Sequence, residues 1–179
     1  MSAAAAFAAW LGAALIVLSE GRRGLALGMG LVTVGFAVLA LAAGELEAAA
    51  ALFVGGGVAV VQRLRTGRDV WGVMPPRSTA RLVLAIAIGL LALWISTSVM
   101  TGPGATVRFA SISVLGLMAA RLLTPTETAG VLTALAALAL SVAVAGGVAA
   151  TSPGPALYVL AAIVAGGISL IKVREPNGA

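Results

Sequence analysis

The sequence predicts an all-α polytopic membrane protein with about seven transmembrane helices. Of the 179 residues, 61% are hydrophobic and a further 23 are glycine, whereas soluble domains are about 45–50% apolar with glycine included. Only 11 basic and six acidic side chains are present, and the mean hydropathy is +1.13. Because one transmembrane helix needs about 20 apolar residues, the chain has room for about seven spans and little else.

Seven uninterrupted apolar runs mark the predicted spans. The first run follows no Lys or Arg, so we interpret it as a span rather than as a signal peptide. The third and seventh runs are short, and we expect them to stand nearly upright in the bilayer. No connection is long enough for a soluble domain, which makes residues 1–179 a single transmembrane domain. The runs cover residues 2–19, 24–43, 46–62, 82–100, 105–123, 128–150 and 155–171.

Helix-start signals lie between the later runs. The segment from Thr124 to Glu127 has the form of a capping box with Pro125 at the first helical position, and Ser152 with Pro153 is suited to cap the last span. Small residues also recur inside the runs, where they favour close helix packing over ligand binding. The main groups are Gly24 and Gly28, Gly55 to Gly57, Gly146 and Gly147, and Ala162 and Gly166.

The basic residues predict the orientation. Positive side chains near span ends stay on the cytoplasmic side, and ten of the eleven fall on one side of the predicted topology. Only Arg108 falls on the other side, where Glu45 and Glu47 also lie. We therefore expect the N-terminus outside and the C-terminus inside. The ten residues are Arg22, Arg23, Arg63, Arg65, Arg68, Arg77, Arg81, Arg121, Lys172 and Arg174.

The residues that are missing exclude several kinds of chemistry. Without Cys or His, the chain has no disulfides, iron–sulfur clusters, His-ligated haem, Cys/His zinc sites or His-based acid–base catalysis. No nucleophile-and-base pair and no phosphate-binding loop is recognisable either. We therefore predict no catalytic, cofactor-binding or metal site, and no nucleic-acid partner.

A few polar residues within or beside the spans are candidates for a polar path. They are Thr33, Ser141, Arg121 and Glu127. Hydroxyl groups in membrane helices usually bond to their own backbone, Glu127 is suited to cap the sixth span, and Arg121 is placed to snorkel toward water. These structural interpretations are favoured over a solute or proton path.

The segment from 63 to 81 is the most distinctive connection, because it combines several arginines with a tryptophan. Attraction to anionic lipid is the simpler interpretation. The alternative is docking of a cytoplasmic partner, for which Arg and Trp are the usual anchors. The residues concerned are Arg63, Arg65, Arg68, Trp71, Arg77 and Arg81.

Two triplets of spans joined by a single fourth span give a 3+1+3 layout, which would fit parallel repeats about an axis normal to the membrane. Sugar transporters of the SWEET type have this plan, but no proline here is followed by the glutamine of their Pro-Gln signatures.

The chain also resembles, in size, span count and layout, the small E-type membrane subunit of hydrogenase-4 and formate hydrogenlyase complexes. The stretch from Ser19 to Arg63 resembles the family's early helices, and Arg108 to Lys172 occupies the place of a triplet similar to the K-type subunit of complex I. K-type subunits place glutamates within their spans, whereas the middles of the fifth and sixth spans here are apolar. The resemblance therefore implies a scaffold in a prokaryotic plasma (inner) membrane rather than a proton carrier.

Span composition also favours a subunit. Alanine and glycine gain little on transfer to lipid, so spans rich in them are better buried against other helices. We expect a non-catalytic, multi-pass membrane subunit of a complex I-like, hydrogenase-like or cation-antiporter-like assembly. Its partners would be the lipid bilayer, other membrane subunits and a cytoplasmic subunit. The alternative is a small-solute transporter.

Overall fold

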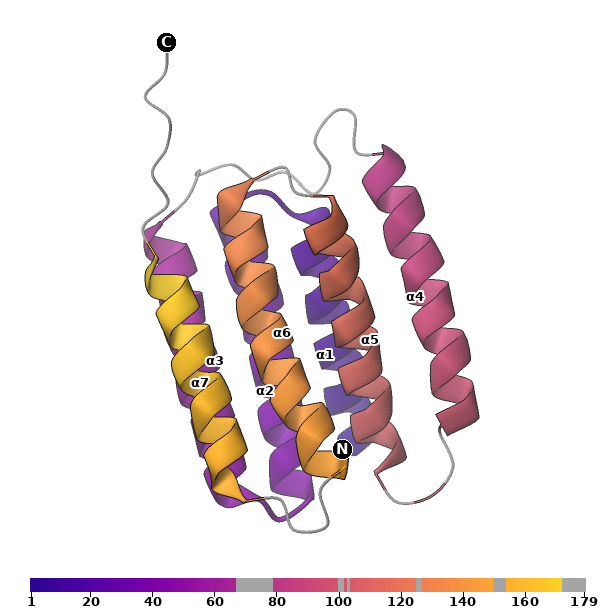
Figure 1. Ribbon diagram of the computed structural model, residues 1–179, viewed down its shortest axis with the longest axis vertical. Coiled ribbons are helices and arrows are strands. Elements are labelled where there is room, and N and C mark those ends of the chain that lie inside the picture. The colour runs from indigo at the N-terminus through magenta and orange to yellow at the C-terminus, as the bar shows by residue number, and fades with distance from the viewer. Residues whose placement is uncertain (67–78, 100–101, 103, 125–126, 150–153, 172–179) are drawn as a thin grey trace.

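A computed structural model describes residues 1–66, 79–99, 102, 104–124, 127–149 and 154–171. Within this part of the chain there are seven helices and no strand (Figure 1). Their ends agree with the predicted apolar runs to within a few residues. The helices are α1 (Ser2–Leu18), α2 (Arg22–Ala42), α3 (Leu46–Arg65), α4 (Thr79–Val99), α5 (Ala105–Leu123), α6 (Thr128–Ala149) and α7 (Pro155–Leu170).

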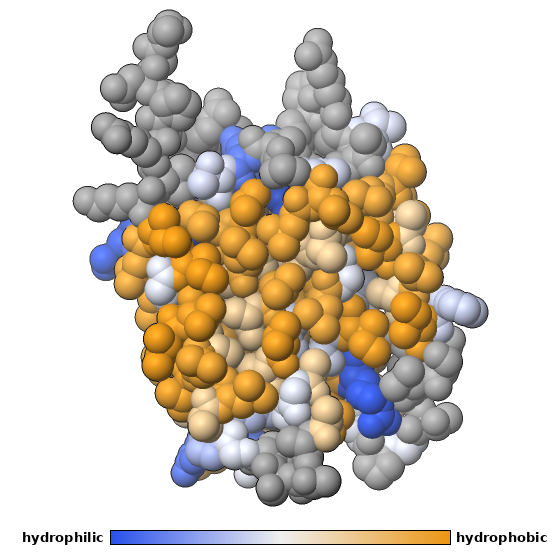
Figure 2. Space-filling model, viewed as in Figure 1, coloured by the Kyte–Doolittle hydropathy of each residue, from blue (hydrophilic) through white to orange (hydrophobic). Residues whose placement is uncertain are grey.

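Four of the described helices, α2, α3, α5 and α6, are long and apolar enough to cross a membrane. The helix α1, the stretch Leu82–Ala92 within α4, and α7 are apolar but shorter. Figure 2 shows a broad apolar band between two more hydrophilic ends. The structure therefore supports an all-helical protein with several apolar helices suited to a bilayer, whereas a count of seven spans stays a prediction.

The helices form two facing layers with α4 at one edge (Figure 1). One layer contains α1, α2 and α3, and the other contains α5, α6 and α7. The layers meet where α1 packs on α5, α2 on α6 and α3 on α7, while α4 packs mainly on α5. The 3+1+3 grouping thus appears in the packing, with the fourth helix outside the two triplets.

The order of helices around the bundle argues against the expected parallel repeats. A two-fold axis along the membrane normal would exchange α1 with α5 and α3 with α7, so a ring around it would place α3 beside α5 and α7 beside α1. In the described helices neither pair is in contact, and the ring instead runs α1, α2, α3, α7, α6, α5. The likeness of the two triplets is therefore one of length and direction, not of two-fold symmetry.

Glycine allows the helix axes to approach closely, as the sequence predicted. A Cβ atom built on Gly28 would lie 2.7 Å from the carbonyl oxygen of Gly12, and one built on Gly55 would lie 2.5 Å from the Cα of Ala162. Real side chains do not approach so closely, so backbone contact between α1 and α2, and between α3 and α7, depends on these glycines. Larger side chains fill the remaining core, including Ile16, Phe36, Leu52, Met118 and Leu140.

The predicted capping box is wrong in its placement. Thr124 directly follows α5 as its C-cap residue, and its Oγ1 donates a hydrogen bond to the carbonyl oxygen of Ala120 at 3.1 Å instead of capping the next helix. The helix α6 begins at Thr128, so Glu127 directly precedes it. Pro125, Thr126, Ser152 and Pro153 lie outside the described residues. The helix α7 begins with Pro155, which has the fixed φ suited to a first helical position.

Candidate functional site

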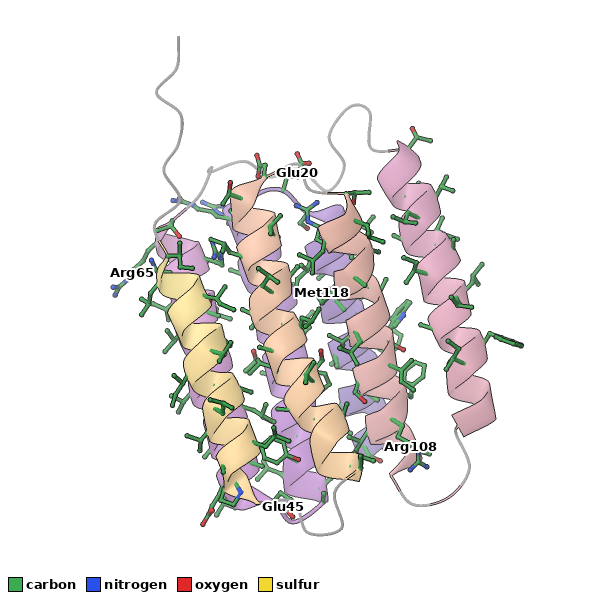
Figure 3. The ribbon with its side chains drawn as sticks, viewed as in Figure 1. Glu20, Glu45, Arg65, Arg108 and Met118 are labelled. Carbon is green, nitrogen blue, oxygen red and sulfur yellow. The ribbon has the colours of Figure 1, made fainter. Side chains whose placement is uncertain are left out.

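Charged side chains collect at the two ends of the bundle. We call one end the basic end, because five arginines and two glutamates of the described chain lie there. Glu20 and Arg65 mark this end in Figure 3, and Glu45 and Arg108 mark the opposite end. The segregation agrees with the pattern that the sequence predicted. The basic end contains Glu20, Arg22, Arg23, Arg63, Arg65, Arg121 and Glu127.

Arg121 lies inside the basic end. Its side chain is 1% exposed, so the expectation that it snorkels to water is wrong. Its Nη2 donates a hydrogen bond to the carbonyl oxygen of Ser19, at 3.4 Å. Its guanidinium packs on Gly130 of α6, where a Cβ atom would lie 2.8 Å from the Arg121 Cζ. One arginine therefore joins the ends of α1, α5 and α6.

Arg63 is also buried, at 1% exposure. The sequence assigned it to a surface connection beginning at residue 63, but α3 continues to Arg65 and carries Arg63 toward the interior. It shares a helical face with buried Leu52, Gly56 and Ala59, at spacings of three and four residues. This periodicity was the signal that could have predicted its burial.

The other residues of the Arg-rich segment differ in how far the structure describes them. Arg65 is exposed at the end of α3. Arg68, Trp71 and Arg77 lie outside the described residues. Arg81 lies in α4, but its side chain is not among those described.

The two hydroxyl groups of the candidate polar path donate hydrogen bonds to the backbone of their own helices. Thr33 Oγ1 donates to the carbonyl oxygen of Met29 at 2.8 Å, and Ser141 Oγ donates to that of Leu138 at 2.9 Å. Thr133 and Ser169 donate to carbonyl oxygens of their own helices in the same way. Thr33 also packs on Gly56 of α3. These contacts match the interpretation that hydroxyl groups within the spans bond to their own backbone.

An apolar groove of about 780 Å³ lies along α3 and α7. Its lining includes small residues, and valine, isoleucine and leucine side chains flank them. Glu47 is the charged residue in the lining, near the start of α3. The lining residues are Glu47, Ala50, Ala51, Val54, Gly55, Val58, Val159, Ala162, Ile163, Gly166, Gly167 and Leu170.

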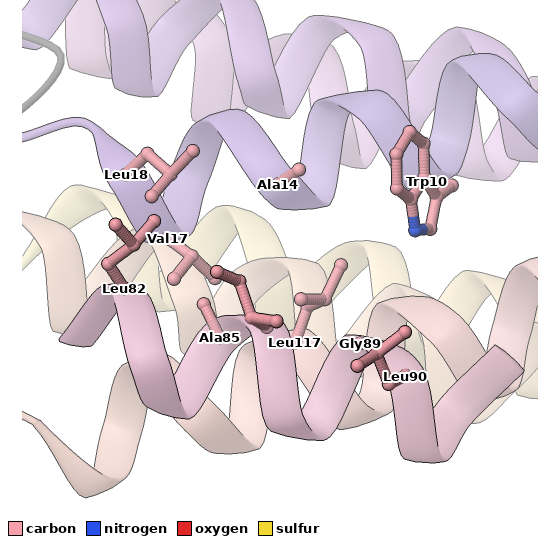
Figure 4. Close-up of a pocket in the computed structure, with 10 residues that line it drawn as sticks. Trp10, Ala14, Val17, Leu18, Leu82, Ala85, Gly89, Leu90 and Leu117 are labelled. Carbon is pink, nitrogen blue, oxygen red and sulfur yellow. The ribbon is translucent and has the colours of Figure 1, made fainter. Parts of the chain in front are cut away.

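A smaller apolar slot of about 300 Å³ lies between α1, α4 and α5 (Figure 4). Trp10, Ala14 and Val17 of α1 face Ala85 and Gly89 of α4 across it. The slot reflects the loose attachment of α4, which packs mainly on α5 and only slightly on α1.

Within the described residues, no three of His, Cys, Asp and Glu are grouped closely enough to hold a metal ion. No family model, curated protein or solved structure matches the chain.

Proposed function

We propose that the protein is a non-catalytic integral membrane subunit, a scaffold that holds other membrane subunits of a larger assembly. The groove along α3 and α7 carries this proposal. Surface helices that face only lipid have no need of a groove lined by alanine and glycine, since these residues gain little from lipid contact. A neighbouring helix gains more, because small residues let its backbone approach closely.

The dimensions of the groove suit one side of a helix. From Glu47 to Val58 the groove follows α3 for about 17 Å, at 1.5 Å per residue. Its volume of about 780 Å³ over that length accommodates part of the width of a helix that is about 10 Å across. Gly167 lines the groove and has no atom within 4 Å of a built Cβ. Packing inside this chain therefore does not explain why that residue is glycine.

Charge at the two ends of the groove favours a different protein over a second copy. Glu47 lies at one end, and Arg65 follows Val58 by seven residues on the same stripe of α3. Two copies related by an axis along the membrane normal would bring Glu47 close to Glu47 at the same depth. Like charges placed together disfavour such a pair. A partner helix with a basic group at the Glu47 end and an acidic group at the Arg65 end would fit.

The orientation that we propose places the basic end in the cytoplasm and the N-terminus outside, because basic side chains near span ends stay inside. In this reading the protein crosses the plasma membrane of a prokaryote several times. The resemblance to E-type subunits of hydrogenase-4 and formate hydrogenlyase complexes supports an assembly of the complex I-like class, and the apolar middle of α6 favours a scaffold without chemistry of its own.

Native mass measurement tests the proposal. The protein is purified from its own membranes in mild detergent, and the mass of the particle that contains it is measured. We expect a particle with other membrane subunits in fixed stoichiometry, far above a small multiple of 17.5 kDa. A monomer or a homo-oligomer that moves a solute in liposomes would instead support the transporter alternative.

A further inference from the structure

We propose that Arg63 is an anion-binding residue, and that its ligand is the phosphate group of an anionic phospholipid. The observation is a buried guanidinium without an acceptor. Arg63 is 1% exposed, and its Nε, Nη1 and Nη2 atoms form no hydrogen bond in the structure as described. Five N–H donors on a permanent charge are costly to bury without a partner. The proposal concerns this chain alone and does not depend on partner subunits.

The packing of the helices fixes the depth of Arg63. The antiparallel helices α2 and α3 meet where Gly30 faces Val60 and Gly56 faces Thr33, which places Arg63 level with Ala26. Ala26 is four residues into α2, so Arg63 lies about 6 Å below the first residue of that helix. This depth corresponds to the region near the lipid headgroups rather than to the middle of the bilayer.

Neighbouring surfaces at this depth suit a lipid. The parallel helices α3 and α7 meet at Gly55 with Ala162 and at Val58 with Gly166, so Arg63 lies level with the end of α7. Leu64 and Ile171 are exposed there, at 51% and 55%. Acyl chains would cover these side chains, and the headgroup of the same molecule would lie at the basic end. Basic sites between membrane helices on the cytoplasmic side are typical places for anionic headgroups.

Long-range charge at the basic end also favours an anion. The helices α2 and α6 both begin there, and their N-terminal ends carry partial positive charge. Arg22 and Arg23 begin α2, and Arg65 ends α3 two residues beyond Arg63. The acidic side chains described at this end are Glu20 and Glu127, which lie beside α1 and α6, and neither accepts a hydrogen bond from Arg63.

Thermal unfolding in detergent tests the proposal with phosphatidylglycerol as the probe. We expect delipidated wild-type protein to gain about 5–11 °C in its unfolding midpoint when phosphatidylglycerol is in hundredfold excess over its dissociation constant. Phosphatidylcholine should give little gain, because its choline cation is repelled by the arginines. Arg63→Leu should abolish the gain. The matched control Arg65→Leu removes an exposed charge from the same helix and should keep most of it.

A second measurement uses the delipidated proteins alone. If Arg63 has no anion within the chain, Arg63→Leu should unfold at a higher temperature than wild type, since it removes an uncompensated buried charge at similar volume. A lower midpoint for Arg63→Leu would overturn the proposal, because it would mean that the chain already compensates the charge. Arg63→Gln gives the same comparison with a side chain that still donates hydrogen bonds.

Three further outcomes would also overturn the assignment. Equal loss of the lipid effect in the Arg63 and Arg65 variants would mean general attraction to basic surface. Equal protection by inorganic phosphate at the same concentration would identify a soluble anion rather than a lipid headgroup. A photoreactive residue at Leu64 that cross-links to a second protein, with no response of the wild type to phosphatidylglycerol, would identify a protein partner.

Discussion

Arg121 near the end of α5 donates a hydrogen bond to the carbonyl oxygen of Ser19, the residue that follows α1, over 3.4 Å. The two residues are 102 positions apart in the sequence, so the bond joins the two layers of the bundle. A helix end leaves its last carbonyl groups without partners, and the buried guanidinium supplies a charged donor to the residue after α1. Arg121 therefore has a structural role that a snorkelling side chain would not have.

The contact between Arg121 and Gly130 predicts the effect of a single methyl group. Gly130→Ala would place a Cβ atom 2.8 Å from the Arg121 Cζ, so the buried guanidinium that donates to Ser19 must shift. We expect the variant to lose about 1–3 kcal/mol of stability, the usual cost of overpacking, measured by unfolding in detergent. Gly57→Ala is the control, because no atom lies within 4 Å of its added methyl group. Equal stability of the two variants would contradict this account.

Two glycines of α2 give a matched test of the close approach between α1 and α2. Gly28→Ala would bring a methyl group to 2.7 Å from the Gly12 carbonyl oxygen, whereas at Gly30 the nearest atom is the Val60 Cγ2 at 3.9 Å. We expect Gly28→Ala to destabilise the bundle by about 1–3 kcal/mol. Gly30→Ala should be neutral or stabilising by up to about 1 kcal/mol, because alanine is the better helix former. The unfolding midpoints of the two variants are measured in the same detergent. A lower midpoint for Gly30→Ala than for Gly28→Ala would contradict the prediction.

The sequence predicted where the helices begin and end, but not which helices pack against each other. Helix ends follow from where apolar runs stop, and Gly44, with φ at +85°, marks such a stop between α2 and α3. The lateral order has no such signal. Buried residues occur around α6 from Gly130 to Gly147 with polar atoms nearly absent, so the pattern does not indicate which face meets α2, α5 or α7. Two-fold repeat symmetry was the basis on which the order of the helices could be predicted, and the observed helix contacts do not have that symmetry.

The burial of Arg63 could not be predicted from the amino-acid composition of its segment. A run of arginines resembles a surface connection, and Arg65 fits that interpretation because it is exposed. Arg63 differs because helical periodicity places it on the buried face with Leu52 and Ala59. Hydropathy averaged over a window does not distinguish these two arginines, whereas the position of each within the helical turn does.

Cysteine labelling tests the proposed orientation, and the natural absence of cysteine gives a clean background. Cysteines at Ser2 and Ala43, at the end opposite the basic end, should react in intact cells with a membrane-impermeant thiol reagent. Cysteines at Thr66, which directly follows α3, and at Thr79, which begins α4, should react only after the membrane is opened. The expected sides follow from the excess of arginine at the basic end. The opposite labelling pattern would mean that the basic end faces outward.

Two glycines with open space around them test the proposed docking groove. Neither Gly167 nor Gly57 has an atom within 4 Å of a built Cβ, so Gly167→Leu and Gly57→Leu should both fold, with similar unfolding midpoints. Of these two glycines, Gly167 lines the groove and Gly57 does not. A leucine there would fill the space that a partner helix occupies, at a cost of about 1–3 kcal/mol, and each 1.4 kcal/mol is tenfold in affinity.

We therefore expect Gly167→Leu to reduce recovery of the partner subunits by about tenfold or more, and Gly57→Leu to leave it unchanged. Recovery is measured by quantitative mass spectrometry after purification from native membranes. A photoreactive residue at Ile163, in the groove, should cross-link to a partner helix, whereas one at Val83 on the exposed side of α4 should cross-link to lipid. Partner recovery that is equal in both glycine variants would place the partner on another face of the bundle and leave the groove to lipid.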